Sequence, residues 1–192
     1  MYRFSIVVIT LLSLGVARDV AAQGFLSPFA GTTLSSPTSA GSSTKTGFGI
    51  AFGALGGVMG GETEIAYFPE LIDNAANAIA KSKVITFSGG ALIGPTLGRV
   101  KPYAAIGAGN LHLNVTTLAS VVRPNVETIS NNYFTFNAGG GIFGFFTEHI
   151  GVRADLRYTR AFGFKIADLE TAGIALDKFN FWRATFGLAA KF

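Results

Sequence analysis

The sequence predicts an all-β fold: an eight-stranded antiparallel up-and-down transmembrane β-barrel with short turns at one end and long loops at the other. Three observations predict it. Charged residues make up only 14% of the chain and the mean hydropathy is +0.43, whereas soluble domains carry about 25% charged residues. After residue 22 no apolar run reaches the length of a membrane helix, about 18 residues. Apolar residues instead alternate with small or polar ones, and in lipid such strands satisfy their backbone groups by closing into a barrel.

Residues 1–22 have the composition of a secretory signal peptide. Arg3 gives a basic start, residues 5–17 are an apolar run, and Val20-Ala21-Ala22 supplies small residues at the expected cleavage point. The run is shorter than the roughly 20 apolar residues that cross a bilayer. We therefore expect a boundary after Ala22, with residues 23–192 forming one exported barrel domain.

Charge and cysteine content exclude several other classes. The chain has 15 basic and 11 acidic residues, and removal of the leader takes Arg3, Arg18 and Asp19 with it, which leaves a net charge of +3. That charge is too small, and too scattered, to indicate a nucleic-acid partner. The chain has no cysteine, so an exported form is held together by its core or by lipid and not by disulfides.

Eight strand-like stretches follow the leader, each bounded by turn signals. The connections after the second, fourth and sixth stretches are short, whereas those after the first, third, fifth and seventh are long. Short periplasmic turns and long extracellular loops are typical of outer-membrane barrels. The predicted strands are Gly24–Leu34, Thr46–Gly56, Gly61–Phe68, Lys83–Ile93, Lys101–Val115, Asn132–Phe146, Ile150–Arg160 and Phe179–Phe192. The predicted long loops are Ser35–Lys45, Pro69–Ser82, Thr116–Asn131 and Ala161–Lys178.

The stretch from Phe181 to Phe192 shows the alternation most clearly. Apolar residues occupy every even position from Trp182 onward, and the odd positions between them carry small, polar or charged residues such as Arg183 and Lys191. We expect the even positions to face lipid. Aromatic residues also gather in two bands, which we expect at the two membrane interfaces. The loop-end band comprises Tyr67, Phe134, Phe136, Tyr158, Phe179 and Trp182, and the turn-end band comprises Phe25, Tyr103, Phe145, Phe146 and Phe192.

On several predicted strands the charged residues alternate with the apolar ones, so the two kinds lie on opposite faces of the strand. Glu62 and Glu64 do so on the third strand, and three further charges do so on the seventh. Because a lone buried charge is costly, we expect these groups to pair inside the barrel. The near balance of charge favours a structural ion-pair network, and a gated ion path through it is the alternative. Eight strands leave a bore that side chains largely fill. The predicted network comprises Glu62, Glu64, Arg153, Asp155, Arg157 and Arg183.

Three stretches carry a family resemblance. Pro102–Gly109 has the pattern PYxxxGxG, Phe136–Gly141 has the sequence FNAGGG, and Ile150–Arg160 has the sequence IGVRADLRYTR. Over essentially all of residues 23–192 the chain resembles the OmpA-like small outer-membrane β-barrel family. The resemblance implies a bacterial outer-membrane location among outer-membrane lipids. It also implies that Phe192, at the end of the closing strand, is an assembly signal for the barrel-assembly machinery.

The expected function is that of an integral outer-membrane protein with a structural or surface-contact role and at most limited permeation. Any extracellular ligand is expected to bind through the long loops. Of two histidines, His149 falls in a turn, and His112 is predicted on the inner face with no serine or carboxylate at short spacing. We therefore predict no catalytic residue, no cofactor and no metal. Two alternatives stay open: a soluble exported barrel that binds an apolar ligand inside it, and a lipid-A-modifying membrane enzyme that uses His112.

Overall fold

The computed structural model describes residues 22–34, 44–69, 80–117, 127–162 and 180–192. These residues form eight β-strands, in which apolar and aromatic residues recur with the period of two that an extended chain requires. The strands are β1 (Gln23–Thr33), β2 (Thr46–Leu55), β3 (Met59–Pro69), β4 (Ala80–Ile93), β5 (Val100–Thr117), β6 (Glu127–Phe145), β7 (Ile150–Phe162) and β8 (Asn180–Lys191).

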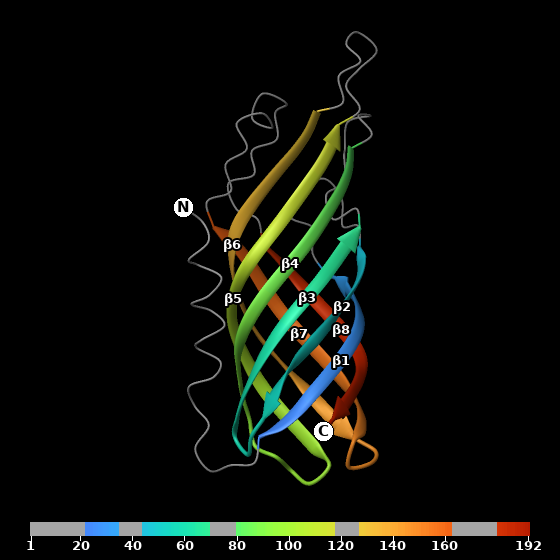
Figure 1. Ribbon diagram of the computed structural model, residues 1–192, viewed down its shortest axis with the longest axis vertical. Coiled ribbons are helices and arrows are strands. Elements are labelled where there is room, and N and C mark those ends of the chain that lie inside the picture. The colour runs from blue at the N-terminus through green and yellow to red at the C-terminus, as the bar shows by residue number, and fades with distance from the viewer. Residues whose placement is uncertain (1–21, 35–43, 70–79, 118–126, 163–179) are drawn as a thin grey trace.

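Each strand pairs antiparallel with the next along the chain, and β8 pairs with β1 to close the barrel. Figure 1 shows the barrel with its long axis vertical and its strands tilted relative to that axis, with the tight turns and the C-terminus at the bottom. Tilt is a geometric requirement of closure, because the strands must be staggered for the last to meet the first. The predicted eight-stranded antiparallel barrel is therefore confirmed.

The strands are unequal in length, and this inequality was only partly predicted. β5 and β6 have 18 and 19 residues, against 10 in β2, and they extend past their neighbours at the loop end (Figure 1). β6 begins at Glu127 rather than at the predicted Asn132. The polar stretch from Glu127 to Asn131, part of a predicted loop, pairs with β5 as far as Thr117. Backbone pairing in this stretch continues without an alternating apolar pattern in the sequence.

The outward face of the barrel is apolar, as the parity of the strands predicts. Phe48 and Phe52 of β2 and Phe186 and Leu188 of β8 all face outward, with the last two 61% exposed. A soluble barrel with inward apolar faces would show the reverse pattern. Other exposed apolar side chains on the wall are Leu26, Ile50, Ile65, Ile85, Phe87, Ile106, Phe134, Phe136, Ile142, Leu156, Phe162 and Trp182.

The interior has apolar layers at both ends. Near the turns, Phe25 packs edge-on against Phe143, with ring centres 5.3 Å apart, and Tyr103 lies 5.2 Å from the same ring. Phe145 packs against this layer from the same side of β6. The prediction of Phe25, Tyr103 and Phe145 as part of an outer aromatic band is therefore wrong. Their strand parity points them into the narrow bore, which side chains of an eight-stranded barrel fill.

A second apolar layer fills the bore near the loops. It includes Phe68 and Phe181, whose ring centres are 6.2 Å apart. Both side chains are almost completely buried, as are their neighbours in the layer. The two apolar layers enclose a polar zone in the middle of the barrel. The other members of the loop-end layer are Val84, Leu111, Leu113, Tyr133 and Ala161.

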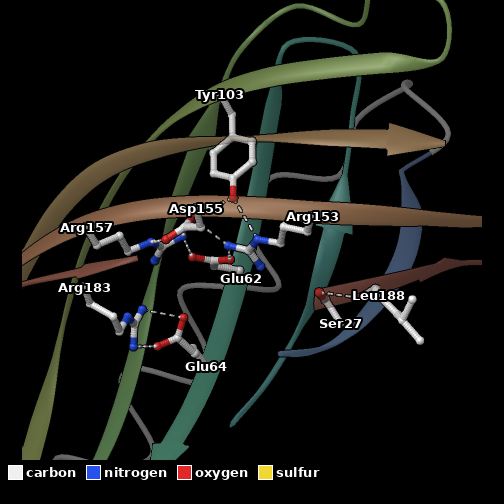
Figure 2. Close-up of polar contacts among 9 residues, drawn as sticks. All are labelled: Ser27, Glu62, Glu64, Tyr103, Arg153, Asp155, Arg157, Arg183 and Leu188. Atoms are coloured by element: carbon white, nitrogen blue, oxygen red, sulfur yellow. Dashed lines mark hydrogen bonds and ion pairs between the residues drawn. The ribbon is translucent and has the colours of Figure 1, made fainter. Parts of the chain in front are cut away.

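The seam between β1 and β8 is interrupted at Pro28. The register runs from Leu26↔Ala190 to Phe29↔Gly187 without a pair between, because proline has no backbone N–H to donate. The Ser27 hydroxyl donates instead to the Leu188 carbonyl at 2.7 Å (Figure 2). An inward serine beside the proline thus satisfies a carbonyl that the ladder leaves without a donor.

Among the described residues, no helix is long and apolar enough to cross a membrane. The predicted signal peptide lies outside the described residues except for Ala22, and most of the predicted long loops also lie outside them.

Candidate functional site

Six charged side chains meet inside the barrel: Glu62 and Glu64 of β3, Arg153, Asp155 and Arg157 of β7, and Arg183 of β8. Alternate residues of a strand share a face, so the spacing of two along β3 and β7 turns each set inward. None of the six is more than 6% exposed. They form two separate ion-pair groups, which Figure 2 shows side by side.

The first group is centred on Glu62, whose two carboxylate oxygens are each ion-paired with a different arginine. Arg153 Nη2 donates to Glu62 Oε2 at 2.8 Å, and Arg157 Nη2 is ion-paired with Glu62 Oε1. Asp155 is the second anion of the group: it accepts from Arg157 Nε at 2.8 Å and from Arg153 Nη2 at 3.1 Å. The Tyr103 hydroxyl donates to Asp155 Oδ2 at 2.6 Å and accepts from Arg153 Nε at 2.7 Å.

The second group is a single pair between Glu64 and Arg183. The guanidinium donates in a bidentate arrangement, from Nη1 to Oε1 at 2.6 Å and from Nη2 to Oε2 at 2.9 Å. The planar fork of arginine matches a carboxylate in this way, and such charge-assisted bonds are the strongest that proteins make. The pair needs no third partner to be neutral.

Both groups span the bore. β3 and β7 are separated by three strands in either direction round the closed sheet, so they lie on opposite walls. The ion pairs of Glu62 with Arg153 and Arg157 therefore brace the barrel across its full width. Glu64 and Arg183 make a second brace, from β3 to β8.

Aromatic rings cover the arginines on the sides where they lack carboxylates. The Arg153 guanidinium carbon lies 5.1 Å from the centre of the Phe143 ring and 5.9 Å from that of Phe25. The Arg183 guanidinium lies 5.6 Å from Phe29 and 6.0 Å from Phe68. Cation–π contact of this kind is stronger where water is excluded. It accounts for Arg153 Nη1 and Arg183 Nε, which are buried with no hydrogen-bond partner among the described residues.

Glycines on β6 make room for the first group. A Cβ atom on Gly139 or Gly141 would clash with a backbone carbonyl of β7. One on Gly139 would also lie 3.0 Å from Arg157 Cγ, and one on Gly141 would lie 2.7 Å from Tyr103 Cζ. The glycine-rich run therefore lets two long side chains lie close to the wall. The sequence pattern indicated tight packing in these strands, but it did not identify which side chains use the space.

Lys101 is an interior cation that was not among the predicted site residues. Its ammonium group donates to the carbonyls of Gly56 and Gly57 at 2.8 and 2.9 Å, to that of Gly94 at 3.2 Å, and to the Thr96 hydroxyl at 3.0 Å. It thus ties the turn between β2 and β3 to the turn between β4 and β5. One feature of the sequence indicated this position: Lys101 lies two residues before Tyr103 on β5, so both side chains are on the same, inward face.

The prediction that His112 faces the interior is wrong. Its neighbours Leu111 and Leu113 are the buried residues of this part of β5, and His112 lies on the opposite face. There its Nδ1 atom is 2.7 Å from Asn132 Oδ1 of the neighbouring strand. Asn110 and Asn132 are exposed on the same outward face, whereas the inward side chains Leu111, Leu113 and Tyr133 at this level are buried. His149 lies in the turn before β7.

The charged groups of the site are paired with one another, and this leaves no carboxylate free of an arginine among the six residues. Three carboxylates face three guanidinium groups, and each carboxylate is engaged by at least one of them. Among the described residues, no group of three or more His, Cys, Asp or Glu side chains is placed to hold a metal ion. What the geometry provides is a neutral, cross-linked plug between two apolar layers.

Comparison with known proteins gives the family. Residues 4–192 match the model of the outer membrane protein beta-barrel domain, and the chain belongs to this family. The protein is therefore an integral barrel of the bacterial outer membrane, which confirms both the resemblance and the predicted location. No curated protein matches the chain in sequence.

Solved structures with the same fold include small outer-membrane barrels from three bacterial groups. A major outer membrane protein from Thermus thermophilus is 12% identical with a TM-score of 0.61, over 90% of this chain and 100% of that one. Neisserial surface protein A is 13% identical with a TM-score of 0.58, over 88% and 95%. The attachment invasion locus protein Ail of Yersinia pestis is 13% identical with a TM-score of 0.57, over 89% and 99%, and it has also been solved with the heparin analogue sucrose octasulfate. At these identities the likeness concerns the fold.

Proposed function

We propose that this outer-membrane barrel is a closed, non-conducting scaffold that anchors its outer loops at the cell surface. The observation that carries the proposal is the pair of ionic braces across the bore, enclosed by aromatic layers at both ends. An aqueous path would have to separate Glu62 from Arg153 and Arg157 and also displace packed rings. Each uncompensated buried charge would then cost several kcal/mol.

The channel alternative is tested by conductance. The full mature chain, refolded in detergent and added to planar bilayers, should give no unit conductance steps, because the bore is plugged. The Glu62→Gln variant, which leaves two arginines sharing fewer carboxylates, is the comparison. Unit steps in the wild type that change size in this variant would replace the scaffold with a gated ion path.

Export and assembly complete the proposal. Residues 1–22 serve as the signal peptide, and Phe192 serves as the signal for the barrel-assembly machinery. In support, the Phe192 N–H donates to the Gly24 carbonyl at 2.9 Å, so the last residue pairs with the first strand while its ring stays exposed. A Phe192→Ala variant should refold normally in detergent yet accumulate poorly in the outer membrane of cells. Equal accumulation would remove the assembly role.

The protein has no catalytic role in this proposal. His112, the one candidate, faces outward and contacts Asn132, away from the buried charges. A His112→Ala variant should leave the acyl chains of cellular lipid A unchanged, as judged by mass spectrometry of lipid A from expressing and non-expressing cells. A change in acylation that depends on His112 would instead establish a lipid-modifying enzyme.

The outer loops are the proposed contact surface. Ail, which shares this fold, has been solved with the heparin analogue sucrose octasulfate, which supports a binding role for such a barrel without specifying the ligand here. Barrels with residues 35–43 and 70–79 replaced by short glycine-asparagine turns should still fold, since the described strands supply the closed sheet. If cells that carry such a barrel no longer bind an extracellular ligand, while the protein still gives the folded band on unheated gels, the loops form the contact surface. Unchanged binding would exclude these two loops and leave the other two loops or the barrel wall as the contact surface.

A further inference from the structure

Arg160 is a charged residue in an aromatic surface on the outward face of β6, β7 and β8. Of the outward side chains that the structure describes on these three strands, it alone is charged. In the register it lies between Phe136 of β6 and Asn180 of β8. Its guanidinium carbon lies 5.4 Å from the centre of the Phe162 ring, which in turn lies 6.2 Å from the ring of Phe134.

The aromatic surface continues on the other side of Arg160. One step toward the turns, Tyr158 and Trp182 face each other with ring centres 5.4 Å apart. A similar pair, Phe48 and Tyr67, lies at the loop end of β2 and β3. Aromatic bands of this kind mark the level of the lipid headgroups. Arg160 therefore lies at the outer interface, the depth at which outer-leaflet lipids carry their phosphate groups.

Among the described residues, no carboxylate is paired with Arg160. Among the described strand side chains, the carboxylates Glu62, Glu64 and Asp155 all turn inward and are engaged by the interior arginines. An outward guanidinium near the hydrocarbon boundary lacks the full hydration that it has in water, so an anion from outside the chain is stabilising. Phosphate suits the planar guanidinium fork, which donates two parallel hydrogen bonds to it.

We propose that Arg160, held against Phe162 and bordered by Tyr158 and Trp182, is a binding site for the phosphate group of an outer-leaflet lipid. The acyl chains of that lipid lie along the apolar wall on the turn side of the site. Leu156 and Phe186 are exposed there, 44% and 61% respectively. The ring of Phe162 holds the guanidinium in place by cation–π contact, so less side-chain freedom is lost when the phosphate binds.

The test is lipid binding to the refolded mature chain in detergent, followed by native mass spectrometry. The probe is lipid A with both phosphates, and the comparison is the same lipid after enzymatic removal of its phosphates. The wild type should bind the phosphorylated lipid about tenfold more tightly, the effect of a charge-assisted contact worth about 1.4 kcal/mol. Millimolar inorganic phosphate should compete weakly, because it has no acyl chains to bury.

Three variants make the assignment specific. Arg160→Gln should abolish the preference for phosphorylated lipid, and Arg160→Lys should retain part of it, since an ammonium keeps the charge but not the fork. Lys83→Gln is the matched control: Lys83 is another outward, exposed cation at the loop end, on β4. It should bind like the wild type.

Three results would overturn the proposal. One is an Arg160→Gln variant, folded by the gel-shift criterion, that keeps the full preference for phosphorylated lipid. Another is a wild type that binds both lipids equally, which tests the site without any substitution. The third is strong competition by inorganic phosphate alone, which would make the site one for a free anion instead of a lipid.

Discussion

The two ion-pair groups in the bore differ in how their charges are shared. Glu62 serves Arg153 and Arg157 at once, with Asp155 as the second anion, so four charges depend on one another. Glu64 and Arg183 form a bidentate pair that is neutral by itself. Both groups are buried to the same degree and both cross the bore. The comparison shows that two equally buried ion-pair groups can differ in how strongly their stability depends on one residue.

The difference follows from strand geometry. β7 presents three alternating charges on one inward face, so its arginines are only two residues from Asp155 and share it. β8 presents one arginine at this level, with small residues beyond it. A shared network gains from cooperativity, but removal of one member leaves several others unsatisfied. The following predictions test this difference, from the largest expected effect to the smallest.

Glu62→Gln should be the most damaging substitution. It leaves Arg153 and Arg157 with only Asp155 as a carboxylate partner, and an uncompensated buried charge costs about 3–5 kcal/mol. Urea unfolding in detergent, followed by the fluorescence of Trp182, measures the loss. Trp182 suits this purpose because it is the one tryptophan of the chain and faces outward, away from the substitution. A loss below that of the Arg183 variant would contradict the idea of a shared centre.

Arg183→Met should cost about 3 kcal/mol, because Glu64 is then buried without its partner. The double variant Glu64→Leu/Arg183→Met should recover most of that loss, since two apolar side chains of similar volume often replace a buried pair without penalty. The same unfolding assay gives the coupling from a double-mutant cycle. Failure of the double variant to recover would indicate that this pair, too, depends on groups beyond itself.

Gly139→Ala should destabilise the barrel by about 2 kcal/mol, as expected for overpacking. The added methyl group would clash with the Leu156 backbone carbonyl oxygen of β7 and lie 3.0 Å from Arg157 Cγ, so both the β7 backbone and the arginine would have to shift. Gly57→Ala is a suitable control, because a Cβ atom there would meet nothing within 4 Å. Equal stability of the two variants would show that the β7 backbone and Arg157 have room to adjust.

Tyr103→Phe should have the smallest effect, a loss of about 1 kcal/mol. The substitution removes one hydroxyl that donates to Asp155 and accepts from Arg153, but both charged groups keep their ionic partners. The aromatic contact with Phe143 is also kept. A loss as large as that of Glu62→Gln would mean that the hydroxyl, and not the carboxylate, is central to the group.

Much of the architecture follows from local pattern. The alternation from Phe181 to Phe192, and the charges at positions 62 and 64, predict which side chains face inward, because strand parity depends only on neighbouring residues. The alternation of short and long connections predicts the up-and-down order. Positive hydropathy without a helical span predicts a closed sheet in lipid. These features of the fold were decided by the sequence alone.

The tertiary structure decided which residues meet. Which side chains face one another across the bore depends on tilt and stagger, properties of the closed barrel that no single strand contains. The sharing of Glu62 by two arginines, the bond that ties Lys101 to two turns, and the outward position of His112 all follow from that closure. For the same reason Phe25 and Tyr103 fill the bore and not the lipid interface, since a closed sheet of eight strands has an inside that its own side chains must fill.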